Sequence, residues 1–195
     1  DTLSMKAQRV RLTVEGGPIG PIIAEDQVRI IEAHLKNALV QGAKATCGGQ
    51  IEIHDGGAYC RPTVLIDVEH SMDVMTDETF GPILPVMPFS TYDEAVSLAN
   101  DTRYGLSSAV FGADEEALAV ARQLEAGAVS INDASLTAII YDGEKMSFKM
   151  SGLGGSRMGE SAIKRFVRTK ALIHKQGDMD DPWWYADAKR NRDSN

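Results

Sequence analysis

Residues 106–131 read LSSAVFGADEEALAVARQLEAGAVSI, and this stretch determines the fold class. Residues 106–111 have the composition of a strand, and a helix is expected from Asp114 to Gly127. The apolar stripe of that helix recurs at helical spacing, at Leu118, Ala121 and Leu124. Residues 128–131 read as a second strand. Strand, helix and strand with short connections predict a βαβ unit, so we expect an α/β fold with a parallel sheet.

A similar pattern precedes this unit. Four apolar residues recur at helical spacing behind an acidic first turn and predict a helix: Val28, Ile31, Leu35 and Leu39. Gly42 stands where such a helix should end. A short strand at residues 45–47 and an extended segment at residues 59–68 are expected to follow.

Residues 79–89 carry a proline at every third position. These residues are Pro82, Pro85 and Pro88. Proline excludes a helix interior and a central strand with a full hydrogen-bond ladder, so we expect an extended segment whose middle can lie on a sheet. Thr91 and Glu94 then have the spacing of a capping box, which predicts the start of another helix.

The last third of the chain is less regular. Periodicity is lost between residues 132 and 155, and a helix is expected over residues 160–168. Its apolar residues are expected to face inward, namely Ile163, Phe166 and Val167. Residues 171–174 read as a final strand, and a polar tail with the run Pro182-Trp183-Trp184-Tyr185 follows.

Composition argues against several classes of partner. The chain has 20 basic and 28 acidic residues and a net charge of −8, which argues against nucleic acid. The basic run at residues 164–170 reads as a solvated helix face with cations near its C-terminal end. No apolar run approaches the roughly 20 residues that a membrane helix needs, so no membrane partner is expected.

Neither a metal site nor a nucleophile is expected from the sequence. The four histidines are scattered without a second ligand at metal-binding spacing. The two cysteines, Cys47 and Cys60, have no activating base nearby in sequence and read as structural residues. Two cysteines also make no disulfide framework, which predicts a reducing, cytoplasmic compartment.

One segment combines an acid, an aromatic residue and a rigid Gly-Pro turn. It reads Asp77-Glu78-Thr79-Phe80-Gly81-Pro82. Glu78 could accept two hydrogen bonds from a sugar diol, and Phe80 could stack against a ring. The alternative is a surface acid and a core phenylalanine, and the residues alone favour this commoner arrangement.

Two stretches of this sequence carry a family resemblance. Residues 78–86 read ETFGPILPV and residues 99–107 read ANDTRYGLS. They resemble the E-x-F-G-P and A-N-x-x-x-Y-G-L segments of the NAD(P)-dependent aldehyde dehydrogenases. Further matching blocks keep the family's order and spacing, at residues 19–23, 41–49, 62–65, 127–132 and 149–154. The resemblance extends from about residue 19 to residue 170.

The resemblance implies a fold and a binding role. The fold would be the family's parallel-sheet α/β catalytic domain, truncated at its N-terminal side. Glu78 would bind the hydroxyls of the nicotinamide ribose, and Phe80 would lie beside the nicotinamide. No catalytic role is carried onto Asn132. Lys145-Met146-Ser147 stand where the family usually has F-G-G, which leaves the wall of the substrate channel unassigned.

The family's order places the dinucleotide-binding domain, a glutamate base and the nucleophilic cysteine before this region. We therefore expect no catalytic residue in the chain, because neither Cys47 nor Cys60 matches the nucleophile. The parent enzyme would oxidise an aldehyde to an acid or acyl-CoA with NAD or NADP, through a cysteine thiohemiacetal. This chain alone is expected to bind neither cofactor and to be inactive. The alternative is a catalytically dead module that keeps the fold for assembly.

These expectations divide the chain into four parts. Residues 1–18 would be an irregular lead-in, and residues 19–170 the C-terminal part of the catalytic domain. Residues 171–176 would be an oligomerisation strand, and residues 177–195 a polar and aromatic tail. The expected partners are a small-molecule aldehyde, the missing N-terminal half of the same protein and a second copy of the chain.

Overall fold

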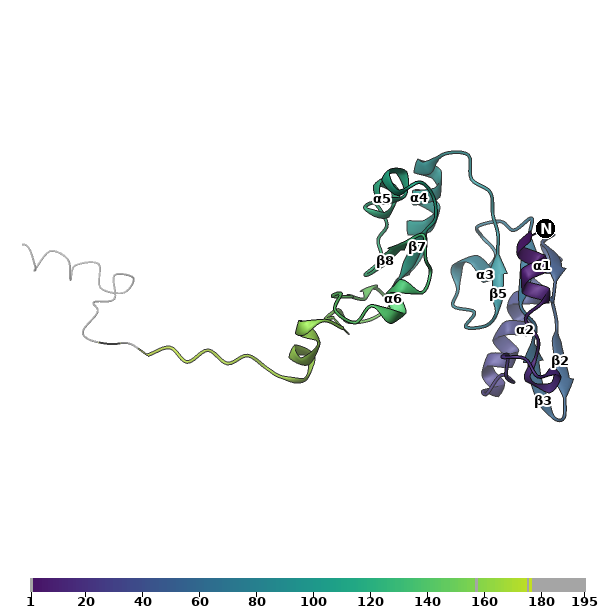
Figure 1. Ribbon diagram of the computed structural model, residues 1–195, viewed down its shortest axis with the longest axis horizontal. Coiled ribbons are helices and arrows are strands. Elements are labelled where there is room, and N and C mark those ends of the chain that lie inside the picture. The colour runs from purple at the N-terminus through teal and green to yellow at the C-terminus, as the bar shows by residue number, and fades with distance from the viewer. Residues whose placement is uncertain (1, 157, 175, 177–195) are drawn as a thin grey trace, which may run out of the picture.

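The computed structural model describes residues 2–156, 158–174 and 176, and they form two lobes joined by an extended connection (Figure 1). The first lobe, residues 2–89, is drawn in purple to blue. Its elements are α1 (Thr2–Gln8), η1 (Thr13–Glu15), α2 (Glu25–Val40), β1 (Lys44–Cys47), β2 (Ile51–His54), β3 (Gly57–Cys60), β4 (Thr63–Ile66), α3 (Asp73–Thr76) and β5 (Ile83–Pro85).

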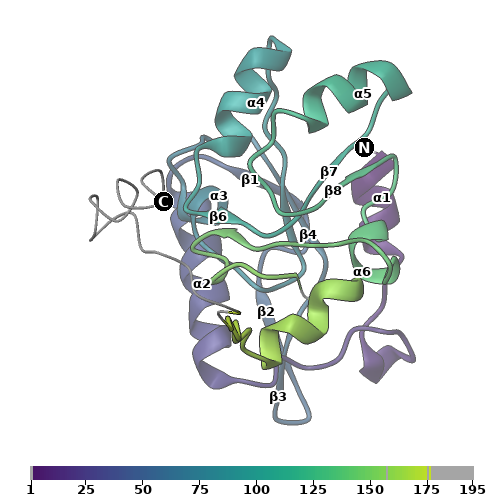
Figure 2. The ribbon, with the colours of Figure 1, turned by 90° about the vertical axis from the view of Figure 1, so that its left-hand side faces the viewer.

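The second lobe, residues 92–166, continues in teal and green, and α4 and α5 lie side by side at one end of it in both views (Figure 2). Its elements are α4 (Tyr92–Asn100), β6 (Tyr104–Gly105), β7 (Ser108–Val110), α5 (Asp114–Ala121), β8 (Val129–Ile131), α6 (Leu136–Ile139), β9 (Phe148–Lys149) and the 3₁₀ helix η2 (Glu160–Phe166).

The core of the first lobe lies between α2 and a three-stranded sheet. The strand order is β1-β4-β5, with β1 antiparallel and β5 parallel to β4. Helix α2 buries Ile31, Leu35 and Ala38 against residues of the sheet and of α3, among them Leu65 and Val74. The predicted helix and the predicted strand at residues 45–47 are confirmed. The predicted stripe of α2 holds at Ile31 and Leu35 but is wrong at Leu39, which is 41% exposed, whereas Ala38 is fully buried.

The predicted βαβ unit is confirmed in the second lobe. β7 and β8 are parallel, with Ser108 opposite Val129 and Val110 opposite Ile131, and α5 connects them. The predicted stripe of α5 is wrong at Leu118, which is 42% exposed, whereas Ala117 is 2% exposed. The buried face of α5 therefore carries Ala117 and not Leu118.

The proline-rich segment also behaves as expected. Residues 83–85 form β5, an edge strand of the described sheet, and Val86 donates its N–H to the carbonyl of Leu65 at 2.8 Å. The expected capping box starts α4, because Thr91 Oγ1 accepts the N–H of Glu94 at 3.2 Å. The Glu94 carboxylate accepts from the N–H of Ser90, one residue earlier than the standard pattern.

The irregular lead-in expected over residues 1–18 is wrong. Residues 2–8 form α1, which packs against β1 and β4, and Ser4 Oγ lies 2.6 Å from Thr46 Oγ1. Leu12 is fully buried and pairs in a short parallel bridge with Ile19. Helix α1 is stabilised by its packing against β1 and β4. Because these contacts come from distant residues, the weak periodicity of residues 1–18 does not predict the helix.

An ion-pair network fastens this lead-in to the β2–β3 hairpin. Arg61 donates to both carboxylate oxygens of Glu15, at 2.6 and 3.1 Å, and its Nε donates to Glu52 at 2.7 Å. The hydrogen bonds from Arg61, with help from the N–H of Leu12, lower the pKa of Glu15 to about 2. Arg61 and then His54 also lower the pKa of Glu52.

The helix expected over residues 160–168 is a 3₁₀ helix, and its apolar residues do not face inward. Phe166 is 82% exposed, and Ile163 and Val167 are exposed as well. The reason is that no described part of the chain offers a surface to cover them. Residues 171–174 have no regular secondary structure, so the expected oligomerisation strand stays a prediction, and the tail from residue 177 lies outside the described residues.

The structure also bears on the cysteines, on metal binding and on membrane-spanning helices. Cys60 is buried in the core of the first lobe, and its burial raises the pKa of the thiol, as a structural cysteine requires. The described residues hold no group of His, Cys, Asp or Glu side chains that could bind a metal ion. Their helices are all too short or too polar to cross a membrane.

Candidate functional site

The segment that carries the two predicted site residues, Asp77–Pro82, crosses the first lobe between α3 and β5. Its first residue is held at the end of α3, where the N–H of Asp77 donates to the carbonyl of Asp73 at 2.9 Å. Its last residue joins the sheet, where the carbonyl of Pro82 accepts the N–H of Thr63 at 2.8 Å. Both ends of the segment are therefore fixed by main-chain hydrogen bonds.

The middle of the segment is fixed on α2 through Thr79. The hydroxyl of Thr79 hydrogen-bonds to Nδ1 of the buried His34 at 3.0 Å, and Gln27 donates its side-chain amide to the Thr79 carbonyl. Gln27 and His34 are seven residues apart, so they lie on one face of α2. A polar pair on an otherwise apolar helix face thus serves to hold this segment.

Gly81 brings the segment close to the same helix face. A methyl group added at Gly81 would lie 2.7 Å from Cδ1 of Ile31, which is fully buried. A larger residue at this position would force the Ile31 side chain to shift, so the Gly-Pro turn expected from the sequence has a packing reason.

Glu78 and Phe80 lie on either side of the anchored Thr79 and are both exposed. Phe80 is 79% exposed, and its φ of 45° lies in the left-handed region that bulky side chains avoid. Such a conformation costs about 1–2 kcal/mol, and the exposed ring gains little burial in return. The expectation of a core phenylalanine at this position is wrong.

The chemistry that this pair can perform is binding. A carboxylate accepts hydrogen bonds through two oxygens, and no described side chain or main-chain group donates to Glu78. The Phe80 ring offers an apolar face next to it. An exposed acceptor and an exposed ring on a rigid segment fit a ligand that carries a diol and a flat ring, such as a nicotinamide nucleoside.

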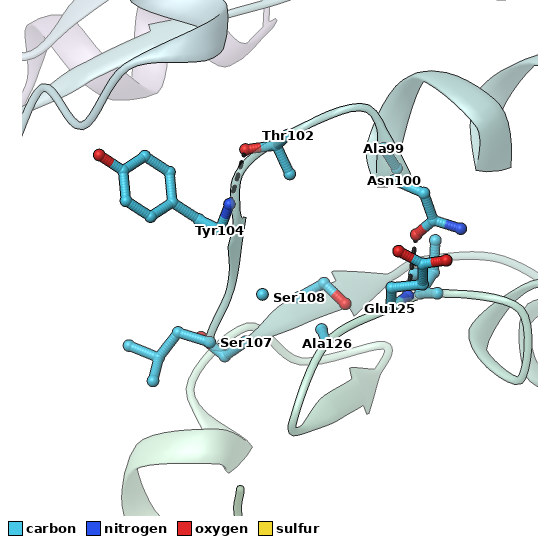
Figure 3. Close-up of a pocket in the computed structure, with 11 residues that line it drawn as sticks. Ala99, Asn100, Thr102, Tyr104, Ser107, Ser108, Glu125 and Ala126 are labelled. Carbon is cyan, nitrogen blue, oxygen red and sulfur yellow. Dashed lines mark hydrogen bonds between the residues drawn. The ribbon is translucent and has the colours of Figure 1, made fainter. Parts of the chain in front are cut away.

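The A-N-x-x-x-Y-G-L stretch of the second lobe has a structural role. Asn100 Oδ1 accepts the N–H of Glu125 at 2.8 Å (Figure 3). The side-chain amide of Asn100 also donates to the carbonyl of Gln123 at 2.8 Å. A methyl group at Gly105 would lie 2.5 Å from the carbonyl oxygen of Glu125. The cavity beside these residues has a volume of about 200 Å³, and its walls include Tyr104, Ser108 and Ala126. It holds no cluster of groups suited to acid–base or nucleophilic chemistry.

Asn132 is likewise a structural residue. Its side chain continues the β7–β8 pairing, because its amide oxygen accepts the N–H of Gly112 at 2.9 Å and its amide nitrogen donates back to the Gly112 carbonyl at 3.0 Å. The same nitrogen donates to Asp114 at the start of α5. The left-handed φ of 57° at Asn132 is one that asparagine tolerates well.

Lys145, in the region that departs from the family pattern, is 5% exposed. Its ammonium donates to the carbonyls of Thr137, at 2.7 Å, and Ile140, and lies 3.0 Å from Met158 Sδ. Its N–H donates to the buried Ser156 hydroxyl at 2.8 Å. The sequence held no periodic signal for this burial, which depends on carbonyls at the C-terminal end of α6.

Comparison with known proteins assigns this architecture. The sequence model of the aldehyde dehydrogenase family matches residues 3–172. A Staphylococcus saprophyticus protein assigned to the aldehyde dehydrogenases is 37% identical over 161 residues, 81% of this chain and 33% of its own length. PutA from Anabaena variabilis, also assigned to these enzymes, is 58% identical with a TM-score of 0.86, covering 94% of this chain and 40% of PutA.

Two relatives were solved with bound molecules. Betaine aldehyde dehydrogenase from Staphylococcus aureus, in complex with NAD⁺, is 31% identical with a TM-score of 0.75, over 85% of this chain and 34% of the enzyme. A variant of AldC from Pseudomonas syringae, with NAD⁺ and octanal, is 33% identical with a TM-score of 0.79, over 90% of this chain and 37% of AldC. The chain spans a third to two fifths of these relatives, and it belongs to the aldehyde dehydrogenase family.

Proposed function

We propose that this chain is the C-terminal part of the catalytic domain of an NAD(P)-dependent aldehyde dehydrogenase, and that it supplies the contacts to the nicotinamide end of the cofactor. Glu78 binds the ribose hydroxyls, and Phe80 lies beside the nicotinamide ring. The observation that carries the proposal is the Asp77–Pro82 segment, which holds both side chains exposed on a backbone anchored at Asp77, Thr79 and Pro82.

The residues of the Asp77–Pro82 segment have two different roles, anchoring the backbone and contacting the cofactor. Thr79 and Gly81 face α2 and fix the backbone, and Glu78 and Phe80 face away from it. When bound, the cofactor supplies the acceptor for hydride, and the protein supplies orientation. Glu78 fixes the ribose, and Phe80 limits the positions open to the ring. This placement favours transfer because an aligned reactant needs no further ordering.

The remaining parts of the reaction belong to residues outside this chain. In the proposed enzyme a cysteine thiolate attacks the aldehyde and forms a thiohemiacetal, hydride leaves for NAD(P)⁺, and water or coenzyme A releases the acyl group. The cysteines here do not fit that role, because Cys60 is buried with a raised pKa and Cys47 hydrogen-bonds to the carbonyl of Pro62. The chain alone therefore does not turn over aldehyde.

The exposed apolar residues support a partner in the complete protein. Phe166, Leu172 and Ile173 are each more than 80% exposed, which is unusual for a chain that functions alone. The proposed partners are the N-terminal part of the same protein and a second copy, which would together cover them.

The proposal is tested in a chimera. Residues 3–172 replace the matching stretch of PutA, and NAD⁺ affinity and aldehyde oxidation are measured for the chimera and for its Glu78→Gln and Phe80→Ala variants. Loss of one charged hydrogen-bonding group weakens binding by about 1.5–3 kcal/mol, so Glu78→Gln should raise the NAD⁺ Kd roughly tenfold or more. Glu32→Gln, an exposed change on α2, is the matched control.

The possible results distinguish the proposed ribose contact, an inactive assembly module and an isolated chain that is itself active. An NAD⁺ Kd that is the same for Glu78→Gln and Glu32→Gln contradicts the ribose contact. A folded chimera that binds NAD⁺ and oxidises no aldehyde favours the assembly module. Formation of NADH by the isolated 195-residue chain with a panel of aldehydes would overturn the assignment of the nucleophile to another part of the protein.

A further inference from the structure

The two lobes share few polar contacts apart from the connection between them. Among the described residues, side-chain hydrogen bonds link them at two places. His70 Nε2 lies 3.0 Å from Asp101 Oδ2, and an Arg103 guanidinium nitrogen lies 2.7 Å from Asp77 Oδ1. Both contacts join the α3 region of the first lobe to the loop between α4 and β6.

That loop is held firmly on its own side. The carbonyl of Arg103 accepts the N–H of Met150 at 2.9 Å, next to the β6–β9 pair, and Thr102 Oγ1 accepts the N–H of Tyr104 at 3.2 Å. The Arg103 guanidinium lies over the Tyr104 ring, 5.2 Å from its centroid, which limits the directions it can take. Arg103 is thus a preoriented cation.

The two residues that contact the first lobe, Asp101 and Arg103, stand at positions for which the family segment specifies no residue type. In A-N-x-x-x-Y-G-L, the fixed residues Asn100, Tyr104 and Gly105 build the loop itself. Asp101 and Arg103 occupy two of the three open positions and make both contacts to the first lobe.

The Arg103 contact lies next to the proposed cofactor site. Asp77, its partner, directly precedes Glu78, and Thr79, directly after Glu78, is bound to α2. Glu78 thus stands between one residue anchored to the second lobe and one anchored to the first. The direction of its carboxylate depends on both anchors, and the Asp77 anchor is the more exposed of the two.

We propose that Arg103 is a positioning residue for Glu78: through its ion pair with Asp77 it fixes the start of the Asp77–Pro82 segment and so the direction in which Glu78 meets the ribose. The pairing with Arg103 also keeps Asp77 from competing with Glu78 for the same hydroxyls. The link to the ribose rests on the proposed function, and the effect on the segment does not.

The effect on the segment is measured in the 195-residue chain by amide hydrogen exchange. An exposed ion pair contributes a fraction of a kcal/mol, so Arg103→Met should speed exchange of the Asp77 amide, which donates to the Asp73 carbonyl at 2.9 Å, about two- to fivefold. The charge-swapped double variant, Arg103→Asp with Asp77→Arg, should restore slow exchange. High salt should bring the unmodified chain close to Arg103→Met, because the pair is open to solvent.

Lys44→Met is the matched control, since it removes another exposed ion pair of the first lobe, Lys44–Asp67 at 2.8 Å. It should leave exchange of the Asp77 amide unchanged. Unchanged exchange in Arg103→Met, an equal increase in Lys44→Met, or failure of the charge swap to restore slow exchange would each overturn the proposal.

The ribose link is measured in the PutA chimera, where Arg103→Met should raise the NAD⁺ Kd about two- to fivefold. The two proposals fail differently. If Arg103→Met speeds exchange while Glu78→Gln leaves NAD⁺ affinity unchanged, the positioning of the segment stands and the ribose contact fails. If Glu78→Gln weakens binding while Arg103→Met alters neither exchange nor affinity, the ribose contact stands and the positioning role fails.

Discussion

Gly81 lies so close to Ile31 that an added methyl group would come within 2.7 Å of Cδ1 of that fully buried side chain. This contact decides how near the Asp77–Pro82 segment can approach α2. The hydrogen bond between Thr79 and His34 is made on the same face of the helix, so the two contacts support each other.

Gly81→Ala should destabilise the first lobe. Overpacking a core costs typically about 1–3 kcal/mol, and the side chain of the fully buried Ile31 would have to shift to make room for the added methyl group. The change is measured as a lower midpoint of urea unfolding. Gly20→Ala is the control, because nothing lies within 4 Å of an added methyl group there. Equal midpoints for the two variants would show that the segment can move away from α2.

Phe80→Gly should stabilise the chain. It removes a left-handed residue of φ 45° and loses little burial, since the ring is exposed, so a gain of up to about 1 kcal/mol is expected. Thermal unfolding measures the gain. Phe111→Gly removes a similarly exposed ring at a residue with an ordinary φ and should give no gain. A loss of stability in Phe80→Gly would mean that the ring packs in solution.

Acid should release the lead-in from the β2–β3 hairpin. Hydrogen bonds from Arg61 lower the pKa of Glu15 from 4.5 to about 2. A lowered pKa in the folded state adds stability that is present above the unfolded value and is lost as the pH falls through the folded value. Stability should therefore decline between about pH 4.5 and pH 2.

The Glu15→Gln variant tests this assignment. It should show a shallower decline of the melting temperature over the same pH range, because it has no carboxylate to protonate at this position. Glu32→Gln, which makes no ion pair with the described residues, should follow the unmodified chain. Identical profiles for all three proteins would remove Glu15 as the source.

Lys145→Met should destabilise the second lobe, although the methionine side chain is similar in shape to that of lysine. The ammonium of the buried Lys145 donates to the carbonyls of Thr137 and Ile140, and losing a hydrogen bond made by a charged group costs about 1.5–3 kcal/mol. Chemical unfolding measures the loss. Lys36→Met, at an exposed site on α2, is the control and should change stability by less than about 0.5 kcal/mol. A neutral Lys145→Met would show that water replaces the ammonium.

The sequence was most informative where one element carries its own periodicity. The existence and order of helix α2 and of the β7–α5–β8 unit follow from spacing. Details do not, because α5 ends at Ala121 and not at Gly127, and Leu118 and Leu39 are exposed. The β2–β3 hairpin was not predicted, although Asp55-Gly56 at its turn, with φ of 50° and 80°, is a strong hairpin signal.

Other features depended on long-range contacts that spacing does not encode. The burial of Lys145 depends on carbonyls of α6, and the order of α1 on the strands it packs against. For the candidate site, the resemblance pointed to Glu78 and Phe80, and the structure added the anchors around them. Arg103 could not be identified from sequence, because its partner lies 26 residues away and in the other lobe.

Strand β5 has one more consequence, which concerns fibril formation. The N–H of Val86 points to β4, so the nitrogen of Pro85, one residue earlier, faces the open edge of the described sheet and has no hydrogen to donate. A strand of another chain that paired along this edge would lack one main-chain hydrogen bond, the one that the nitrogen of residue 85 would otherwise donate. Pro85 therefore hinders edge-to-edge pairing of two sheets. This matters because residues 79–89 have no charged side chain that could oppose such pairing.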